Sequence, residues 1–197
     1  MEILKKFLHN EVIHMDNIEK EFKTKYGYAI DMESFDNAVD VLRGKFVSKE
    51  DELERINVLR KQVNDLHVEG KPDVFKPGFN EELQNYVYYI FKDPEQKIVV
   101  ADKDGEICGF AILHHIYKPE NPFMKVRDFL DIDEFCVDEK HRREGIATDM
   151  VEFIKNFAID QGYHRLELNM WEFNQDALAF YEAAGFETFR RYMEMFI

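Results

Sequence analysis

The chain has 197 residues, of which 45% are hydrophobic, and this is enough for one domain or for one domain with an appendage. The formal net charge of −14 argues against a nucleic-acid partner, because phosphate backbones bind basic surfaces. The same acidity weakly favours a cationic substrate such as an amine, although an acidic surface that keeps the protein in solution is the simpler interpretation. The longest aromatic and apolar run, at residues 86–91, is far too short to span a membrane.

The two cysteines, Cys108 and Cys136, both fall inside predicted strands and show no CxxC spacing. We interpret them as buried free thiols in a reducing cytosol. The N-terminus lacks the long apolar segment and the cleavage pattern of a signal peptide. We therefore expect a cytoplasmic protein.

Residues 1–37 look separate from the rest of the chain. Apolar residues predict an amphipathic helix in this segment: Ile3, Leu4, Phe7, Leu8 and Ile13. We expect an extra helix packed on the domain that follows, and a dimerisation arm or a substrate lid are the alternatives. The predicted organisation is therefore a helical extension at 1–37 and a main domain at 38–197.

Strand and helix patterns alternate along the main domain. Periodicity and turn residues first predict a strand at 39–47, a helix at 48–67, a loop at 68–79, a helix at 81–91, a hairpin with strands at 97–101 and 106–116, and a loop at 118–125. They then predict a strand at 129–137, a helix that runs from 146 to a stop at 162, a strand at 165–170, a helix at 174–184 and a strand at 186–197. This order indicates a mixed α/β layer fold.

The strand at 129–137 leads through a short basic turn into the next helix. Arg142, Arg143, Gly145 and Ala147 place two guanidinium groups and two small residues at the start of that helix. A helix N-terminus carries unpaired N–H groups and a partial positive charge, so it binds phosphate well. Small residues allow a ligand to approach the backbone closely. On its own, this stretch predicts only an anion site.

Two motifs together resemble the GCN5-related N-acetyltransferase (GNAT) family. The first runs from Arg142 to Ala147 and fits the family's acetyl-CoA-binding pattern Arg/Gln-x-x-Gly-x-Gly/Ala, with Ala147 where many members have Gly. The second follows a strand with Asn174, a helix bearing Tyr181, and a terminal Gly-Phe pair. The resemblance covers the segment 38–197. It implies a mixed, mostly antiparallel sheet with helices on both faces and a central V-shaped splay between two strands.

The resemblance implies where acetyl-CoA would bind as a co-substrate. The pyrophosphate would lie on the amides of the basic turn, and the pantetheine arm would follow backbone groups at the end of the preceding strand. The implied cofactor-binding residues are Phe135, Cys136, Val137, Arg142, Arg143, Glu144, Gly145, Ile146, Ala147, Thr148, Asn174 and Tyr181. No metal is expected, because His114 and His115 are adjacent on a strand and point apart.

Direct transfer of the acetyl group to a primary amine is the chemistry that the resemblance implies. Tyr181 would donate a proton to the leaving thiolate, and Glu134 is the first candidate for the base that takes the amine's proton, with Asp133 and Asp131 behind it. Adjacent residues of a regular strand point to opposite faces, so Glu134 and Asp133 should not share one cleft. Solvent-facing acids with water as the proton acceptor, and a packing role for Tyr181, stay open as alternatives.

Two other functions fit the same motifs. A CoA-binding sensor or scaffold without turnover is the main alternative, and transfer of a longer acyl group is the second. No motif identifies the acceptor, which we expect to be a small-molecule or peptide amine. Neither nucleic acid nor a membrane is an expected partner, and a homodimer would be in keeping with the family.

Overall fold

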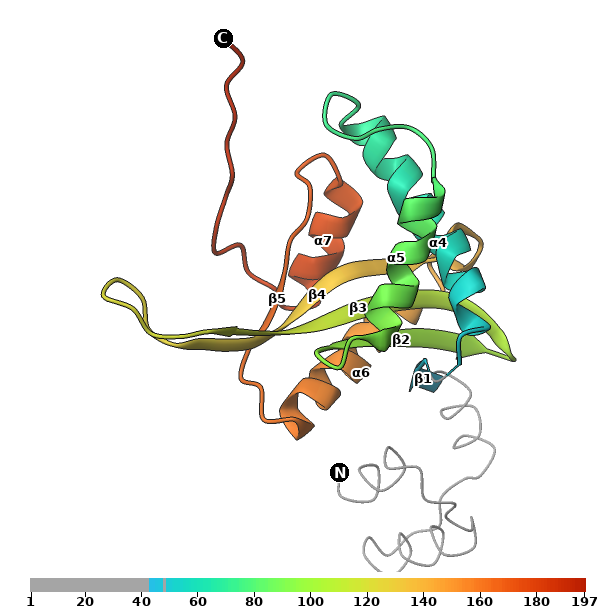
Figure 1. Cartoon of the computed structure of the whole chain (residues 1–197), viewed down its shortest axis with the longest axis horizontal. Helices are drawn as coiled ribbons and strands as arrows, with labels where there is room; N and C mark the ends of the chain where they lie inside the picture. The colour runs from blue at the N-terminus through green and yellow to red at the C-terminus, as the bar shows by residue number, and fades with distance from the viewer. Residues whose placement is uncertain (1–42, 48) are drawn as a thin grey trace, which may run out of the picture. The chain divides into compact units, whose positions relative to one another are not determined.

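The computed structural model describes residues 43–47 and 49–197 (Figure 1). The extension predicted at 1–37 and its boundary with the main domain lie outside the described residues and stay predictions. Within the described part, one sheet has the strand order β1-β2-β3-β4-β5. Its strands are β1 (Arg43–Phe46), β2 (Gln96–Lys103), β3 (Glu106–Lys118), β4 (Arg127–Val137) and β5 (Leu166–Leu168). Neighbouring strands are antiparallel except β4 and β5, which are parallel, so the predicted mixed and mostly antiparallel sheet is confirmed.

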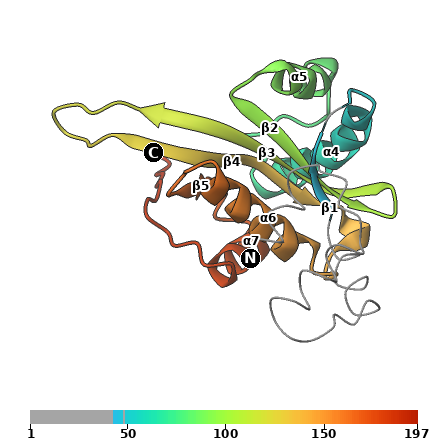
Figure 2. The ribbon, with the colours of Figure 1, turned by 90° about the horizontal axis from the view of Figure 1, so that it is seen from below.

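Helices cover both faces of the sheet, as predicted (Figure 2). They are α4 (Glu52–Gly70), α5 (Glu81–Lys92), α6 (Ile146–Asp160) and α7 (Gln175–Ala183). Leu53, Ile56 and Leu59 of α4 pack with α5 into a core on one face, and Met150 and Ile154 of α6 pack into a second core on the other. Both cores follow from the apolar stripes of amphipathic helices laid on a sheet.

The hairpin between β2 and β3 turns where the sequence predicts it. Asp104 and Gly105 have φ angles of 55° and 86°, which suits a tight two-residue turn whose twist matches the flanking strands. The Gly105 N–H also donates a hydrogen bond of 2.8 Å to Oδ1 of Asp102.

A β-bulge interrupts β4 at its centre. Ile112 of β3 pairs with Glu134 and Leu113 pairs with Ile132, so Asp133 is an extra residue without a partner on β3. The bulge shifts the alternation of side chains along the strand. Our expectation that Glu134 and Asp133 must point to opposite faces assumed a regular strand, and β4 is irregular at that point.

The two parallel strands separate beyond Ile132, which gives the predicted splay. β5 pairs with β4 only over Leu130 to Ile132, whereas β4 continues to Val137. Beyond the last paired residue, β4 keeps its partner β3 on one edge and has no β5 partner on the other. Backbone N–H and C=O groups on that open edge are available to a ligand.

The strand predicted at 186–197 is wrong. These residues carry no strand pairing, and large apolar side chains along them are exposed, among them Phe189 and Met193. Alternating apolar residues show that a segment suits a strand, but a ladder also needs a partner edge, and β5 offers only three paired residues. Instead, Phe189 lies 5.5 Å from the Arg127 guanidinium, and Glu194 forms an ion pair with Lys71.

Candidate functional site

The basic turn after β4 presents a helix N-terminus to solvent. α6 begins after Gly145, whose φ angle is 85° and whose position carries no side-chain cap. Arg143 also adopts a left-handed conformation, with φ of 67°. The first-turn N–H groups of Ile146, Ala147 and Thr148 have no acceptor within the helix. Together with the macrodipole of α6, these amides form a site suited to an anion.

The side chains around the turn include two exposed cations, Arg142 and Arg143, and one acid, Glu144, which is paired with Lys103. Arg142 and Arg143 are exposed, so both guanidinium groups can reach a bound anion. Glu144 accepts a hydrogen bond of 2.7 Å from Lys103 of β2. That hydrogen bond, followed by the contact with His141 Nδ1 at 3.4 Å, lowers the pKa of the Glu144 carboxyl. Lys103 thus holds Glu144, as a carboxylate anion, at the side of the turn.

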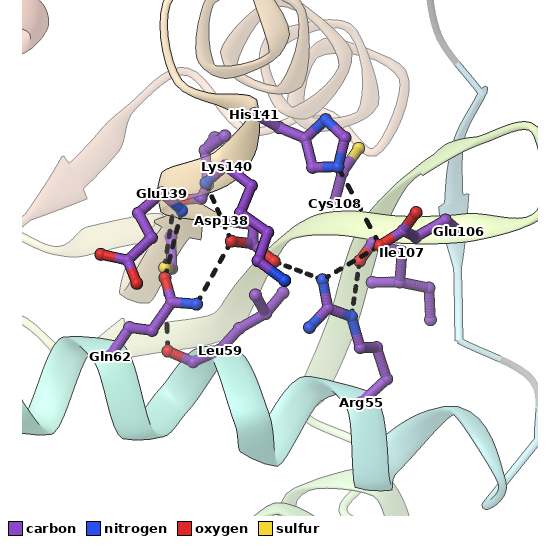
Figure 3. A network of polar contacts seen from close by, with 12 residues as sticks. Arg55, Leu59, Gln62, Glu106, Ile107, Cys108, Asp138, Glu139, Lys140 and His141 are labelled. Carbon is purple, nitrogen blue, oxygen red and sulfur yellow. Dashed lines mark hydrogen bonds and ion pairs between the residues drawn. The ribbon is translucent and has the colours of Figure 1, made fainter.

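Asp138 anchors the turn to α4, as Figure 3 shows. Its side chain is 1% exposed and forms an ion pair with Arg55, which also donates a hydrogen bond of 3.0 Å to the carbonyl of Ile107. Gln62 donates to Asp138 Oδ1 at 3.3 Å, and its own Oε1 accepts from the Glu139 amide at 3.2 Å. The start of the turn is therefore fixed by two side chains of one helix.

The protonation of Asp138 reflects this anchoring. Burial alone would raise the pKa of the carboxyl, but hydrogen bonds from Arg55, from the Lys140 amide and from Gln62 outweigh burial and lower the pKa to about 2. No pattern in the sequence predicted a role for Asp138, Arg55 or Gln62. Neither Arg55 nor Gln62 belongs to the apolar stripe of α4, so no local pattern pointed to them.

The end of β4 supplies the predicted residues Phe135, Cys136 and Val137. Phe135 and Val137 pack toward the core under α6, whereas Cys136 is buried in the core under α4 and α5. Burial raises the pKa of the Cys136 thiol to about 12, so it is a neutral packing group and a poor nucleophile. The backbone of these three residues lies on the open edge of β4, within the splay.

α7 brings Asn174 and Tyr181 to the same region. Asn174 is the N-cap, and its Oδ1 accepts a hydrogen bond of 3.2 Å from the Ala177 amide. The Tyr181 ring packs edge-on against Phe135 at 6.2 Å and against Phe186 at 5.7 Å. Desolvation, with a smaller contribution from Cys136, raises the pKa of Tyr181 to about 12. Its phenol is therefore neutral and a proton donor at ordinary pH.

Three acids line β4 on the side of the splay that α4 and α5 cover. Glu134 accepts two hydrogen bonds from Arg60 of α4, at 2.8 Å and 2.9 Å. Burial, followed by the charges of Asp133 and Glu167, raises the pKa of Asp131 to about 6. Desolvation and the charge of Glu134 also raise the pKa of Asp133.

The charges of Asp133 and Glu134 both raise the pKa of Tyr86 on α5, after the larger effect of its burial. Both carboxylates therefore lie near the same residue of α5. This is possible because the bulge interrupts the regular alternation of side chains along β4.

An aromatic cluster joins the loop after α4 to the loop after β5. His67 stacks on Phe75 at 4.8 Å, and Phe75 meets Trp171 edge-on at 5.0 Å. Phe173 completes the cluster, 6.1 Å from His67. Burial lowers the pKa of His67, so its ring is neutral within the cluster. The cluster brings together loops that lie about 100 positions apart in the sequence.

Gly70 makes room for this cluster, because a Cβ at that position would lie 2.2 Å from the Phe173 ring. We expect Gly70→Ala to displace Phe173 and to lower the free energy of unfolding by about 1–2 kcal/mol, as overpacking does. Trp171 is the single tryptophan of the chain, so its fluorescence reports on the cluster directly. A changed emission maximum in Gly70→Ala, with the exposed neighbour Glu69→Ala unchanged, is the expected result. Identical spectra for both variants would contradict it.

The described residues, 43–47 and 49–197, contain no group of three His, Cys, Asp or Glu side chains that could hold a metal ion. In the same part of the chain, no helix has the length and apolar character to cross a bilayer.

The positions around the splay match a known family. Residues 60–186 match the family described as acetyltransferase (GNAT) family. The chain belongs to the GNAT acetyltransferases. This match includes the basic turn, Tyr181 and α7, so the resemblance carried by the two sequence motifs is confirmed.

Curated relatives carry names of the same kind. N-acetyltransferase 8 of Homo sapiens is 38% identical over 88 residues, which are 45% of this chain and 37% of that protein. L-ornithine N5-acetyltransferase NATA1 of Arabidopsis thaliana is 24% identical over 123 residues, which are 61% of this chain and 52% of that protein. The chain thus spans about a third to a half of the length of these two relatives.

Solved structures confirm the fold. The tetramutant of BH1408 protein from Bacillus halodurans superposes with a TM-score of 0.73 at 23% identity, over 78% of this chain and 98% of that one. Aminoglycoside N-acetyltransferase AAC(6')-Iy in complex with CoA superposes with a TM-score of 0.61 at 17% identity, over 79% of this chain and 95% of that one. At these identities, the likeness concerns the GNAT fold alone.

Gly145 of the turn has a backbone conformation that disfavours a residue with a side chain. Its φ of 85° is disfavoured for any residue with a Cβ, although the nearest atom to an added Cβ, on Asp149, is 3.9 Å away. We expect Gly145→Ala to weaken CoA binding about tenfold, because the first-turn amides must reorient. Gly162→Ala, at a φ of 81° at the other end of α6, is the matched control. Titration calorimetry with CoA separates them, and equal affinities would contradict the prediction.

Proposed function

We infer that this GNAT protein transfers an acetyl group from acetyl-CoA directly to a primary amine. The observation that carries the inference is a set of three features at or beside the end of β4: a helix N-terminus suited to an anion, an open strand edge at Phe135 to Val137, and the neutral phenol of Tyr181, whose ring packs against Phe135. Each suits one part of the reaction. The turn suits a pyrophosphate, the strand edge suits a pantetheine amide and a thioester, and the phenol suits a departing thiolate.

In the proposed reaction, the amine nitrogen attacks the thioester carbonyl carbon and the C–S bond breaks. Backbone N–H groups of Phe135 to Val137 polarise the carbonyl oxygen. Tyr181 donates its proton to the CoA sulfur. The proton released by the amine passes to the carboxylates beside the splay. These belong to Glu134, Asp133 and Asp131, which lie along β4. Asn174 caps α7 and so positions that helix against the cofactor.

The acidic side supports a cationic acceptor. Asp131 and Asp133 lie on β4 beside Glu134, and a positively charged amine is attracted to such a surface. L-ornithine is the acceptor in the name of the Arabidopsis relative, and an aminoglycoside is the acceptor in the name of AAC(6')-Iy. Both compounds carry more than one amine. We therefore propose a small-molecule amine acceptor. The buried free thiols Cys108 and Cys136 support the cytoplasmic location that we propose.

Release of free CoA thiol from acetyl-CoA tests the proposal. The chain is incubated with acetyl-CoA and a panel that holds n-butylamine, L-ornithine, a polyamine and an aminoglycoside, and acetylated product is identified by mass spectrometry. Product with at least one amine, and none without the chain, is the expected result. Tight CoA binding with no acetylated product would favour the alternative of a CoA-binding sensor or scaffold. Turnover with longer acyl-CoA donors in preference to acetyl-CoA would favour the second alternative.

A further inference from the structure

Arg60 is a buried cation on the apolar side of α4. It follows Leu59 in the buried stripe and its side chain is 5% exposed. A buried guanidinium costs free energy unless it is paired and hydrogen-bonded. Its presence on the face of α4 that packs on the sheet therefore requires partners of matching charge.

The structure supplies those partners from three elements. Glu134 of β4 accepts from Nε at 2.8 Å and from Nη2 at 2.9 Å, which is a bidentate ion pair. Nη1 donates to the Leu83 carbonyl of α5 at 2.6 Å and to Asn57 Oδ1 at 3.3 Å. The rings of Phe79 and Tyr86 lie 5.7 Å and 5.4 Å from the guanidinium carbon.

Glu134 lies at the point where this network meets the proposed reaction. It follows the bulge at Asp133 and directly precedes Phe135, the first of the three residues on the open strand edge. Its side chain is 21% exposed, so the carboxylate is fixed by Arg60 on one side and accessible on another. Both oxygens bind the guanidinium, which leaves each of them one further lone pair for a ligand.

We propose that Arg60 is a positioning residue that fixes the Glu134 carboxylate toward the acceptor amine and compensates its charge. The inference rests on the proposed acetyl transfer. A lone carboxylate beside the acceptor would stabilise the amine as an ammonium ion, which has no lone pair and cannot attack the thioester. Paired with Arg60, Glu134 can accept one hydrogen bond from the amine while its net charge on the acceptor side stays low.

Other charged and titratable groups around Glu134 also contribute to the pH dependence of the reaction. The charged and titratable neighbours are Arg60 and His67 of α4, Tyr86 of α5, and Asp133 and Cys136 of β4. Arg60 is the one cation of permanent charge in this set. Ile112, the partner of Glu134 on β3, is apolar. Removing Arg60 therefore leaves Glu134 without a permanent positive neighbour within this set.

The test compares Arg60→Met with wild type, using the best acceptor of the amine panel, across pH 6 to 10. We expect kcat/KM for the amine to fall about tenfold at neutral pH and to recover as the pH rises, so that the profile moves by about one pH unit to the alkaline side. The KM for acetyl-CoA should stay unchanged. Lys61→Met, at the next position of α4 with an exposed side chain, is the matched control and should behave as wild type.

Two further variants separate positioning from packing. In Arg60→Met with Glu134→Gln, both charges are removed, so we expect the profile to return to the wild-type pH. In Arg60→Lys, the charge is kept and the bidentate geometry lost, so KM for the amine should rise without the alkaline shift. These comparisons hold even where Arg60→Met lowers the melting temperature, because stability alone does not move a pH profile.

An active wild type whose pH profile is unchanged in Arg60→Met overturns the inference and leaves the proposed function standing. The inference is also overturned if the double variant keeps the alkaline shift, because Arg60 would then act through another group. No acetylated product from wild type with any amine overturns the proposed function and this inference together.

Discussion

Asp138→Ala is expected to lower the free energy of unfolding by about 3 kcal/mol, the scale for breaking a buried ion pair. The variant leaves Arg55 with its charge partly buried and removes the acceptor of the Gln62 and Lys140 hydrogen bonds. Because these contacts fix the start of the basic turn, CoA binding should also weaken. Chemical denaturation and calorimetry with CoA measure the two effects.

The exposed neighbour Glu139 offers the control for this variant. Glu139→Ala keeps the backbone amide that donates to Gln62, so it should change stability by less than about 0.5 kcal/mol. If Asp138→Ala were as stable as Glu139→Ala, the anchoring role of Asp138 would be wrong.

Lowering the pH should remove the contribution of Asp138 to folding stability over a defined pH range. The folded-state pKa of about 2 lies below the ordinary value of 3.8, so the stabilisation is complete above that ordinary value and is lost as the pH falls toward 2. The shift corresponds to roughly 2 kcal/mol. In Asp138→Asn, this part of the acid dependence should be absent. Unfolding curves between pH 5 and pH 2 for the two proteins test it, and parallel curves would argue against the shift.

Tyr181→Phe is expected to lower kcat about a hundredfold when chemistry limits the rate, which is the usual scale for losing a general acid. The variant keeps the ring contacts with Phe135 and Phe186, so the fold and CoA affinity should be preserved. The raised pKa of Tyr181, about 12, means that the wild-type phenol stays protonated across the assay range. Pre-steady-state thiol release measures the chemical step.

Tyr163→Phe is the control for Tyr181→Phe, because Tyr163 packs against His115 at 5.3 Å and lies outside the proposed site. It should turn over at the wild-type rate. A Tyr181→Phe protein with an unchanged rate at every pH would remove the proposed role of the phenol and leave it as a packing residue.

Features encoded in a short stretch of sequence were predictable. The turn between the strands predicted at 97–101 and 106–116 and the start of the helix predicted at 174–184 follow from local backbone preferences, and each appears where it was expected. The helix after the basic turn followed from the periodicity that begins at Ile146 and from Gly162 at its end. The basic turn itself combines a strand, small residues and a helix start within one stretch.

Features that depend on distant partners were not predictable in the same way. Asp138 meets Arg55, and Glu134 meets Arg60, across sequence separations of 83 and 74 residues. One signal was present, because Arg60 lies beside Leu59 on an otherwise apolar stripe, where a charge needs a buried partner. Nothing local marked the bulge at Asp133, since a bulge is a relation between two strands.

Two ion pairs join α4 to β4 and to the turn that follows it. Arg55 and Arg60 are five residues apart on the helix, about 7.5 Å of axial rise, and they hold Asp138, the first residue after β4, and Glu134, which lies within β4 four positions earlier. Deleting one residue between Arg55 and Arg60 would rotate one end of the helix by about 100° relative to the other and break one of the two ion pairs. The loop at 71–80 lies outside the helix that carries both arginines, so a change in its length leaves the spacing of these two ion pairs unchanged.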